Sequence, residues 1–198
     1  DQIKWYGLKR WLARIIITFL IFGILIAIAS IIIYPNILTV KKQALEIKNI
    51  DQTINIAFVS DIQVGNHKKT AWVEKIVKKI DQLNPDLVIL GGDLIDNEGT
   101  FEDETQYLEP LAALGQRYPI YAIMGNHEYG IGNATKENKN RQTGDRSEDL
   151  IARLKKLNIP LLRNQLSCPT INKQPICLFG IDDIWSRPIN FSELKNWP

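Results

Sequence analysis

The most informative part of this sequence is Leu87-Val88-Ile89-Leu90-Gly91-Gly92-Asp93-Leu94-Ile95-Asp96. Four apolar residues lead into two glycines and then into two carboxylates, which indicates a short buried strand ending in a polar loop. Continuous apolar runs bounded by glycine are typical of parallel strands covered on both faces. The stretch therefore predicts an α/β fold with acidic residues at the carboxyl end of one strand.

Two further apolar runs lead into polar residues in the same way. Residues 54–60 precede Asp61-Ile62-Gln63, and residues 119–124 lead into Gly125-Asn126-His127-Glu128. We call Asp61 to Gln63 the first cluster, Gly92 to Asp96 the second and Gly125 to Glu128 the third. In open α/β sheets the ligand crevice lies beyond the carboxyl ends of the strands, so we expect the clusters to meet there. Their carboxylates, amides and imidazole are suited to divalent metal ions.

Apolar residues recur at helical spacing in three segments, which are residues 70–83, 102–114 and 147–157. Ser147 is placed to cap the last of these helices. Residues 130–145 are polar and rich in Asn, Lys and Gly, and they predict a loop. Strand and helix alternate from about residue 51 onward, as expected for a parallel sheet.

The first 50 residues form a separate unit. Residues 15–34 are twenty consecutive uncharged and mostly apolar residues, which as a helix would span about 30 Å, the thickness of a bilayer core. We interpret them as a transmembrane helix between a basic flank, residues 1–14, and a linker, residues 35–50. A cleaved signal peptide is an alternative because Ala27-Ile28-Ala29 resembles a cleavage site, although the apolar run continues beyond it.

Charge indicates orientation and excludes one class of partner. Lys4, Lys9, Arg10 and Arg14 precede the helix, whereas three lysines follow it in the linker. This bias favours a cytoplasmic N-terminus and a domain outside the cytoplasm. The composition, 45% hydrophobic and 23% charged, is typical of a globular protein, and a net charge of +2 without long basic runs predicts no nucleic-acid partner.

The two cysteines, Cys168 and Cys177, lie in strand-like runs on either side of a predicted turn at Asn172-Lys173. Such a turn would place them opposite each other, with Cβ atoms about 4.5 to 5.5 Å apart, close to disulfide geometry. A disulfide would form in an exported domain. The alternative is that both are small buried hydrophobic residues with free thiols.

The three clusters in this order resemble the motifs of the calcineurin-like metallophosphoesterases, and the chain looks like their bacterial membrane-anchored branch. The family pattern is Asp-x-His, Gly-Asp-x-x-Asp and Gly-Asn-His-Glu or Asp, followed by a separate His and by Gly-His-x-His. The resemblance covers about residues 54–185 and implies part of a four-layer α/β/β/α sandwich over residues 51–198. Because the last two histidine motifs are absent, we expect this domain to be incomplete at its C-terminus and inactive alone.

The resemblance also assigns roles to residues. It implies that Asp61, Gln63, Asp93 and Asn126 bind two divalent metal ions, with Asp93 bridging them. His127 would face the leaving-group oxygen as general acid or transition-state stabiliser, and Asp96 would accept a hydrogen bond from its other ring nitrogen and so orient it. Glu128 is assigned a structural role.

The first cluster departs from the family pattern because Gln63 stands where the family has His. An amide oxygen suits manganese or magnesium better than zinc or iron, so we expect manganese, with iron, zinc and magnesium as alternatives. In a second interpretation Gln63 only hydrogen-bonds Asp61 or bound water. His67, the one other histidine besides His127, matches no family position and is expected on a surface loop.

Two functions follow from these observations. The first is a membrane-anchored hydrolase that cleaves phosphate mono- or diesters with metal-activated hydroxide, acting on a phosphorylated small molecule or a lipid-linked substrate at the bacterial cell membrane. The second is a non-catalytic descendant of the family that binds a phosphorylated ligand or a protein partner.

Overall fold

The computed structural model describes residues 2–48, 50–97, 103–131 and 144–197, and it divides into two units. The first unit, residues 1–45, is dominated by helix α1 (Gln2–Ile28), which continues through a π-helical turn (η1, Ala29–Ile33) into a short 3-10 helix (η2, Tyr34–Asn36). The segment Lys9–Ile31 is long and apolar enough to cross a membrane. The predicted segment, residues 15–34, is helical throughout, and the helix also extends back to Gln2.

The second unit, residues 46–198, is built on a parallel sheet of three strands. The strands are β1 (Ile56–Val59), β2 (Leu87–Leu90) and β3 (Ile120–Ala122), and β2 lies in the middle. Each strand falls inside a predicted apolar run. A parallel bridge between Ala122 and Leu161 extends the sheet beyond β3. The predicted α/β fold with a parallel sheet and one apolar N-terminal helix is therefore confirmed.

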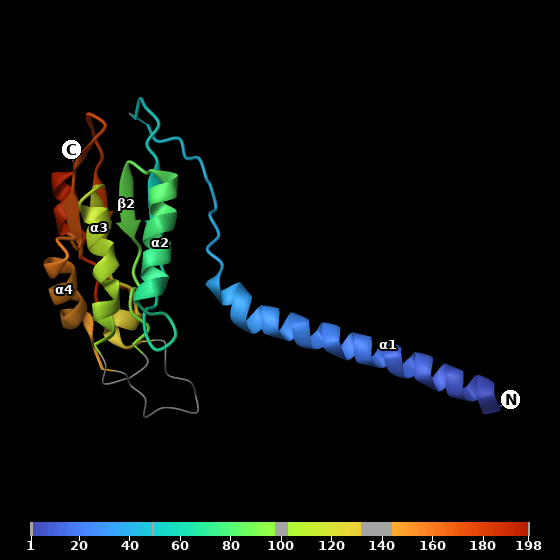
Figure 1. Ribbon diagram of the computed structural model, residues 1–198. Coiled ribbons are helices and arrows are strands. Elements are labelled where there is room, and N and C mark those ends of the chain that lie inside the picture. Colours follow the sequence, from blue (N-terminus) through green and yellow to red (C-terminus); the bar gives the residue numbers. More distant parts are fainter. Residues whose placement is uncertain (1, 49, 98–102, 132–143, 198) are drawn as a thin grey trace. The chain divides into compact units, whose positions relative to one another are not determined.

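Helices connect the strands, as the periodicity predicts. They are α2 (Thr70–Leu83), the 3-10 helix η3 (Glu104–Leu111) with α3 (Ala112–Gly115), and α4 (Ser147–Lys156). These segments pack beside one another (Figure 1). Leu108, Leu111, Leu114 and Leu150 are fully buried. Burial of such side chains contributes about 1.5 to 3 kcal/mol each.

Two helical predictions need correction. Over residues 104–111 the expected α-helix is a 3-10 helix, because Pro110 has no amide hydrogen to donate and its ring crowds the preceding turn. Ser147 is the first residue of α4 rather than its cap. The N-cap position is Arg146, whose side chain makes no capping bond, and the Asp145 carboxylate before it accepts bonds from the Ser147 amide, at 2.9 Å, and hydroxyl. Most of the predicted loop 130–145 lies outside the described residues.

The two faces of the sheet differ in burial. Ala57, Val88, Leu90, Ile120 and Ala122 are buried. On β1 the alternate residues are exposed, with Ile56 at 45% and Phe58 at 62%. At the amino end of β2, Leu87 packs in a cluster with Ile171 and Ile176 of the C-terminal hairpin.

The C-terminal segment forms two antiparallel pairs. β4 (Gln165–Ser167) pairs with β7 (Leu178–Gly180), and β5 (Thr170–Ile171) pairs with β6 (Gln174–Pro175). Asn172 and Lys173 both have positive φ, as a two-residue turn of type I′ requires. The register sets Cys168 opposite Cys177, and the structure joins them in a disulfide. Of the two alternatives for the cysteines, the structure contains the bonded one. A final 3-10 helix, η5 (Ser192–Asn196), follows β7.

Candidate metal centre

The first and second clusters lie side by side beyond the carboxyl ends of β1 and β2. The Asp61 amide donates to the carbonyl of Gly92 at 3.1 Å, and the Gln63 amide donates to the carbonyl of Asp93 at 3.0 Å. The Asp96 amide returns a bond to the carbonyl of Val64 at 2.9 Å. This ladder continues the β1–β2 pairing into the loops, so the polar residues of both clusters occupy one edge of the sheet.

The third cluster joins the same edge through Asp93. The backbone amide of His127 donates to Asp93 Oδ1 at 3.0 Å. Gly92 and Gly125 permit this approach. A Cβ on Gly92, which has φ of +86°, would lie 2.6 Å from the Gly125 nitrogen, and a Cβ on Gly125 would overlap the Asp93 carboxylate. The three clusters are therefore in direct contact, as the topology predicted.

Three of the four predicted metal ligands have an unusual backbone. Asp61, Gln63 and Asp93 have positive φ values of 57°, 47° and 51°. This left-handed region is uncommon for residues other than glycine, above all for a long side chain such as Gln63. Residues held there cost about 1 to 3 kcal/mol each and concentrate at functional sites. The fold stabilises the strained loops through the ladder of backbone bonds between them.

Asn126, the fourth predicted ligand, has its amide group oriented by the neighbouring loop. Its Nδ2 atom donates to the carbonyl of Ile131 at 2.6 Å. This bond fixes the nitrogen side of the amide on the backbone, so the oxygen is the end that can bind a ligand. The orientation suits an amide-oxygen ligand for a hard divalent ion.

His127 is held by the loop of the second cluster. Its Nδ1 atom lies 2.8 Å from the backbone carbonyl oxygen of Asp96 and 3.6 Å from the Asp96 carboxylate. Because a carbonyl oxygen only accepts, Nδ1 must carry a proton, and Nε2 is the atom that can exchange one. Orientation therefore comes chiefly from the main chain of Asp96 rather than from its side chain.

Glu128 is the structural centre of the site. Its side chain is fully buried, and its carboxylate accepts four bonds from the main chain. Leu94 and Ile95 donate to Oε1 at 2.6 and 3.3 Å, and Gly125 and Asp93 donate to Oε2 at 2.8 and 3.1 Å. Burial and the nearby charge of Asp93 raise the pKa of Glu128, although the bonds from Gly125, Leu94 and Ile95 oppose this. One carboxylate thus binds the second cluster to the third.

Two buried residues behind the site were not predicted. Asn97 has φ of 54° and donates from Nδ2 to the carbonyls of His127 and Gly144, at 2.8 and 3.1 Å. The buried carboxylate of Glu104 accepts from the Asn97 amide at 2.9 Å. Asn97 follows Asp96 directly and asparagine tolerates positive φ, so the sequence could have indicated that Asn97 belongs to the site. Glu104 lies outside all three clusters, and nothing in the sequence indicates its role.

A third set of contacts ties the third cluster to the segment after β7. The Tyr129 hydroxyl donates to Asp182 Oδ1 at 2.6 Å, and Arg163 Nε donates to Asp182 Oδ2 at 3.0 Å. Burial raises the pKa of the Tyr129 hydroxyl most, and the hydrogen bond to Asp182 raises it further. His67, in contrast, is exposed on the loop after the first cluster. The hydrogen bond between Tyr129 and Asp182 thus joins the third cluster to a residue 53 positions later in the sequence.

The donor set at the sheet edge consists mainly of oxygen atoms. Among the residues that the structure describes, no three His, Cys, Asp or Glu side chains stand close enough together to hold a metal ion. The predicted ligands are two carboxylates, Asp61 and Asp93, and two amides, Gln63 and Asn126. Such oxygen donors suit manganese, magnesium or calcium more than zinc.

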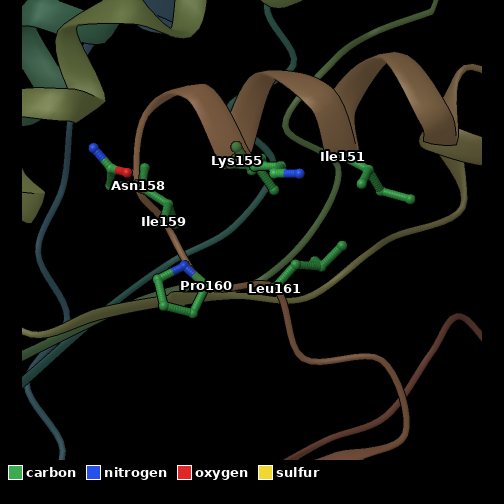
Figure 2. Close-up of a pocket in the computed structure, with 7 residues that line it drawn as sticks. Ile151, Lys155, Asn158, Ile159, Pro160 and Leu161 are labelled. Atoms are coloured by element: carbon green, nitrogen blue, oxygen red, sulfur yellow. The ribbon is translucent and has the colours of Figure 1, made fainter.

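A pocket elsewhere on the domain is separate from this site. Figure 2 shows it between α4 and the segment that follows it. Its volume is about 390 Å³. Its lining consists of Ile151, Leu154, Lys155, Asn158, Ile159, Pro160 and Leu161. None of these residues belongs to the three clusters. A large concave pocket is the usual first place to look for a site, whereas the residues predicted to bind metal lie at the sheet edge instead.

Comparison with known proteins agrees with this geometry. Residues 54–196 match the family of calcineurin-like phosphoesterases, a range that includes all three clusters and the Asp182 contact. The chain belongs to this family. Members of the family use divalent metal ions.

Relatives of this calcineurin-like phosphoesterase occur in animals and bacteria. A transmembrane protein with a metallophosphoesterase domain from Bos taurus is 27% identical over 97% of the chain and 40% of that protein. An uncharacterized metallophosphoesterase from Helicobacter pylori is 26% identical over 75% of the chain and 35% of that protein. A Caenorhabditis elegans protein assigned by name to the metallophosphoesterases is 31% identical over 69% of the chain and 25% of that protein. The chain thus spans 25 to 40% of the length of these relatives.

Proposed function

We propose that this chain is the membrane-anchored part of a metal-dependent phosphoesterase that hydrolyses phosphate mono- or diesters. One observation carries the proposal. Three clusters far apart in sequence meet at the carboxyl edge of one parallel sheet, with Asp93 in contact with both neighbours. A purely structural turn would not need three side chains with oxygen donors at strained backbone positions.

Asp61, Gln63, Asp93 and Asn126 are the residues that would hold two divalent ions, with Asp93 between them. When bound, the ions would offset the phosphate charge and lower the pKa of the attacking water. The amide oxygen of Gln63 makes manganese the preferred ion, with magnesium, iron or zinc as alternatives. A carboxylate suits the shared position because it has two oxygens and a charge that offsets both cations.

His127 would complete the reaction by protonating the leaving oxygen from Nε2. The Asp96 carbonyl keeps Nδ1 protonated at 2.8 Å, so Nε2 carries a proton only when the ring is positively charged. The Asp96 carboxylate lies 3.6 Å from the same ring nitrogen. The main chain of Asp96 therefore sets the ring orientation.

The N-terminal unit supports a location at a membrane. Lys9–Ile31 would cross the bilayer once, and the excess of basic residues before it favours a cytoplasmic N-terminus, with the domain outside the cytoplasm of a bacterial cell. The Cys168–Cys177 disulfide agrees with an oxidising compartment. A tethered site of this kind would act on a phosphorylated small molecule or on a lipid-linked phosphate.

A second function, binding a phosphorylated ligand or a protein partner without catalysis, is favoured by one observation: the described residues contain no group of three His, Cys, Asp or Glu ligands. Hydrolysis of an aryl phosphodiester by the full-length protein with Mn²⁺ separates the two. Asp93→Asn and His127→Ala should each lower activity by at least a hundredfold, with Asp149→Asn on α4 and His67→Ala as matched controls. Full activity in either site variant would refute these roles, and no metal-dependent activity in the wild type would favour the binding function.

A further inference from the structure

A cationic surface borders the candidate site on the side of the first cluster. Between Ile62 and Ile80 there are five lysines and one acidic residue, Glu74, which is a formal charge of +4 in a chain whose total is +2. A local excess of positive charge raises the concentration of anionic ligands nearby. Because this positive charge lies beside the proposed site for phosphate esters, it would attract anionic substrates to that site.

Trp72 attaches this surface to the first cluster. Its indole Nε1 donates to the carbonyl of Ile62, the residue between two predicted metal ligands, at 3.1 Å. Two ammonium groups lie over its ring, Lys68 Nζ at 5.2 Å and Lys75 Nζ at 5.8 Å from the centroid. A cation placed over an indole face in this way is attracted by the negative face of the ring. Trp72 therefore collects two positive charges on one ring that is hydrogen-bonded to the site loop.

The loop that carries Lys68 also touches the second cluster. The Gly65 amide donates to the carbonyl of Lys68 at 3.0 Å, and a Cβ on Gly65 would lie 3.1 Å from the Cβ of Asp96. Lys69 Nζ lies 5.2 Å from the ring centroid of Tyr107 in the neighbouring helix η3. The loop that carries Lys68 and Lys69 therefore lies beside the second cluster, because Lys68 is hydrogen-bonded to Gly65 and Gly65 packs against Asp96.

We propose that Lys68 and Lys75, arranged over Trp72, bind a second phosphate group of the substrate, outside the bond that is cleaved. The inference rests on the proposed function, because the first phosphate would occupy the metal centre. Lysine is a compact point charge that binds phosphate without requiring a fixed geometry. Substrates with two phosphate groups, or with a phosphate and an adjacent phospholipid headgroup, are the class that this surface selects.

Lysine footprinting of the full-length chain in neutral detergent tests this proposal. The protein is acetylated briefly, and each lysine is quantified by peptide mass spectrometry with inorganic phosphate, with dihexanoyl phosphatidic acid, or with dihexanoyl phosphatidylcholine. Acetylation of Lys68 and Lys75 should fall at least threefold with phosphatidic acid, which is a phosphate monoester, or with inorganic phosphate. Acetylation of Lys155 and Lys156 on α4 should stay unchanged. Protection by phosphatidic acid alone identifies a lipid headgroup as the source, and protection by both identifies the phosphate group itself.

Two results would overturn the proposal: no protection by either phosphate compound, or equal protection of the α4 lysines. A separate measurement keeps it distinct from the proposed function. Electron paramagnetic resonance should find the same Mn²⁺ binding in the Lys68→Ala/Lys75→Ala variant as in the wild type. In this variant phosphate should no longer protect Lys69, the lysine that remains in the loop, from acetylation. Loss of Mn²⁺ binding in this variant would place the lysines in the metal centre instead.

Discussion

Replacement of Glu128 by glutamine tests how the site is held together. Each oxygen of the buried carboxylate accepts hydrogen bonds from two backbone amides. In Glu128→Gln one oxygen becomes an NH₂ group, which cannot accept, so two buried amides lose their acceptor. Each unsatisfied buried donor costs about 1 to 3 kcal/mol. The loss is partly offset because a desolvated charge near Asp93 disappears, and we expect a net destabilisation of about 2 kcal/mol or more.

The assay is thermal unfolding of the full chain in detergent, followed by circular dichroism. A loss of about 2 kcal/mol corresponds to a decrease in Tm of at least about 4 °C for a domain of this size. Hydrogen exchange should show faster exchange at the amides of Leu94 and Gly125. Glu74→Gln, at an exposed position on α2, is the matched control and should leave Tm unchanged. An unchanged Tm and unchanged exchange in Glu128→Gln would refute this account of the loops.

Three further predictions concern the metal, the pH dependence and the cysteines. Gln63→His should shift the preference of the full-length protein from Mn²⁺ toward Zn²⁺, measured as the ratio of activities with the two ions; an unchanged ratio would mean that Gln63 does not bind the metal. Hydrogen bonds from the Asn55 amide and from Asn172 lower the pKa of Asp86, so its contribution to stability is present above about pH 4 and is lost as the pH falls through its lowered pKa. Urea midpoints at pH 7 and pH 3 should therefore differ less in Asp86→Asn than in the wild type, and an equal difference would contradict this. Maleimide labelling of denatured, unreduced protein should find no free thiol at Cys168 and Cys177, whereas two labelled thiols would exclude the disulfide.

Much of the fold could be predicted because its main signals are local. The strand β2 and its glycine-rich exit are visible in ten consecutive residues, and helix α2 has the predicted bounds, Thr70 to Leu83. The 3-10 helix before α3 was missed because apolar spacing hides the effect of a single proline, Pro110. At the start of α4 the Asp145 carboxylate accepts a bond from the first helical amide, whereas Ser147 does not act as a cap, and composition does not decide which of two neighbouring polar residues makes such a bond.

The candidate site was predictable as a set of residues but not as a geometry. Order and strand-end position were enough to expect that the three clusters meet. The family resemblance implies that Asp96 orients the ring of His127, but it does not show that the shorter contact is to the backbone carbonyl of Asp96 rather than to its carboxylate. The fourfold role of Glu128, and the Asn97 and Glu104 contacts behind it, depend on main-chain directions that form only when the loops are packed.

Binding of Mn²⁺ to the full-length protein shows whether the three clusters form a metal centre. The loss of free Mn²⁺ signal in electron paramagnetic resonance gives the affinity and the number of ions bound. We predict saturable binding to the wild type, unchanged binding to Asp149→Asn, and at least tenfold weaker binding to Asp93→Asn, because Asp93 is the residue that contacts both other clusters, the first through its backbone carbonyl and the third through its carboxylate. Equal binding by Asp93→Asn and the wild type would contradict the claim that these clusters form a metal centre.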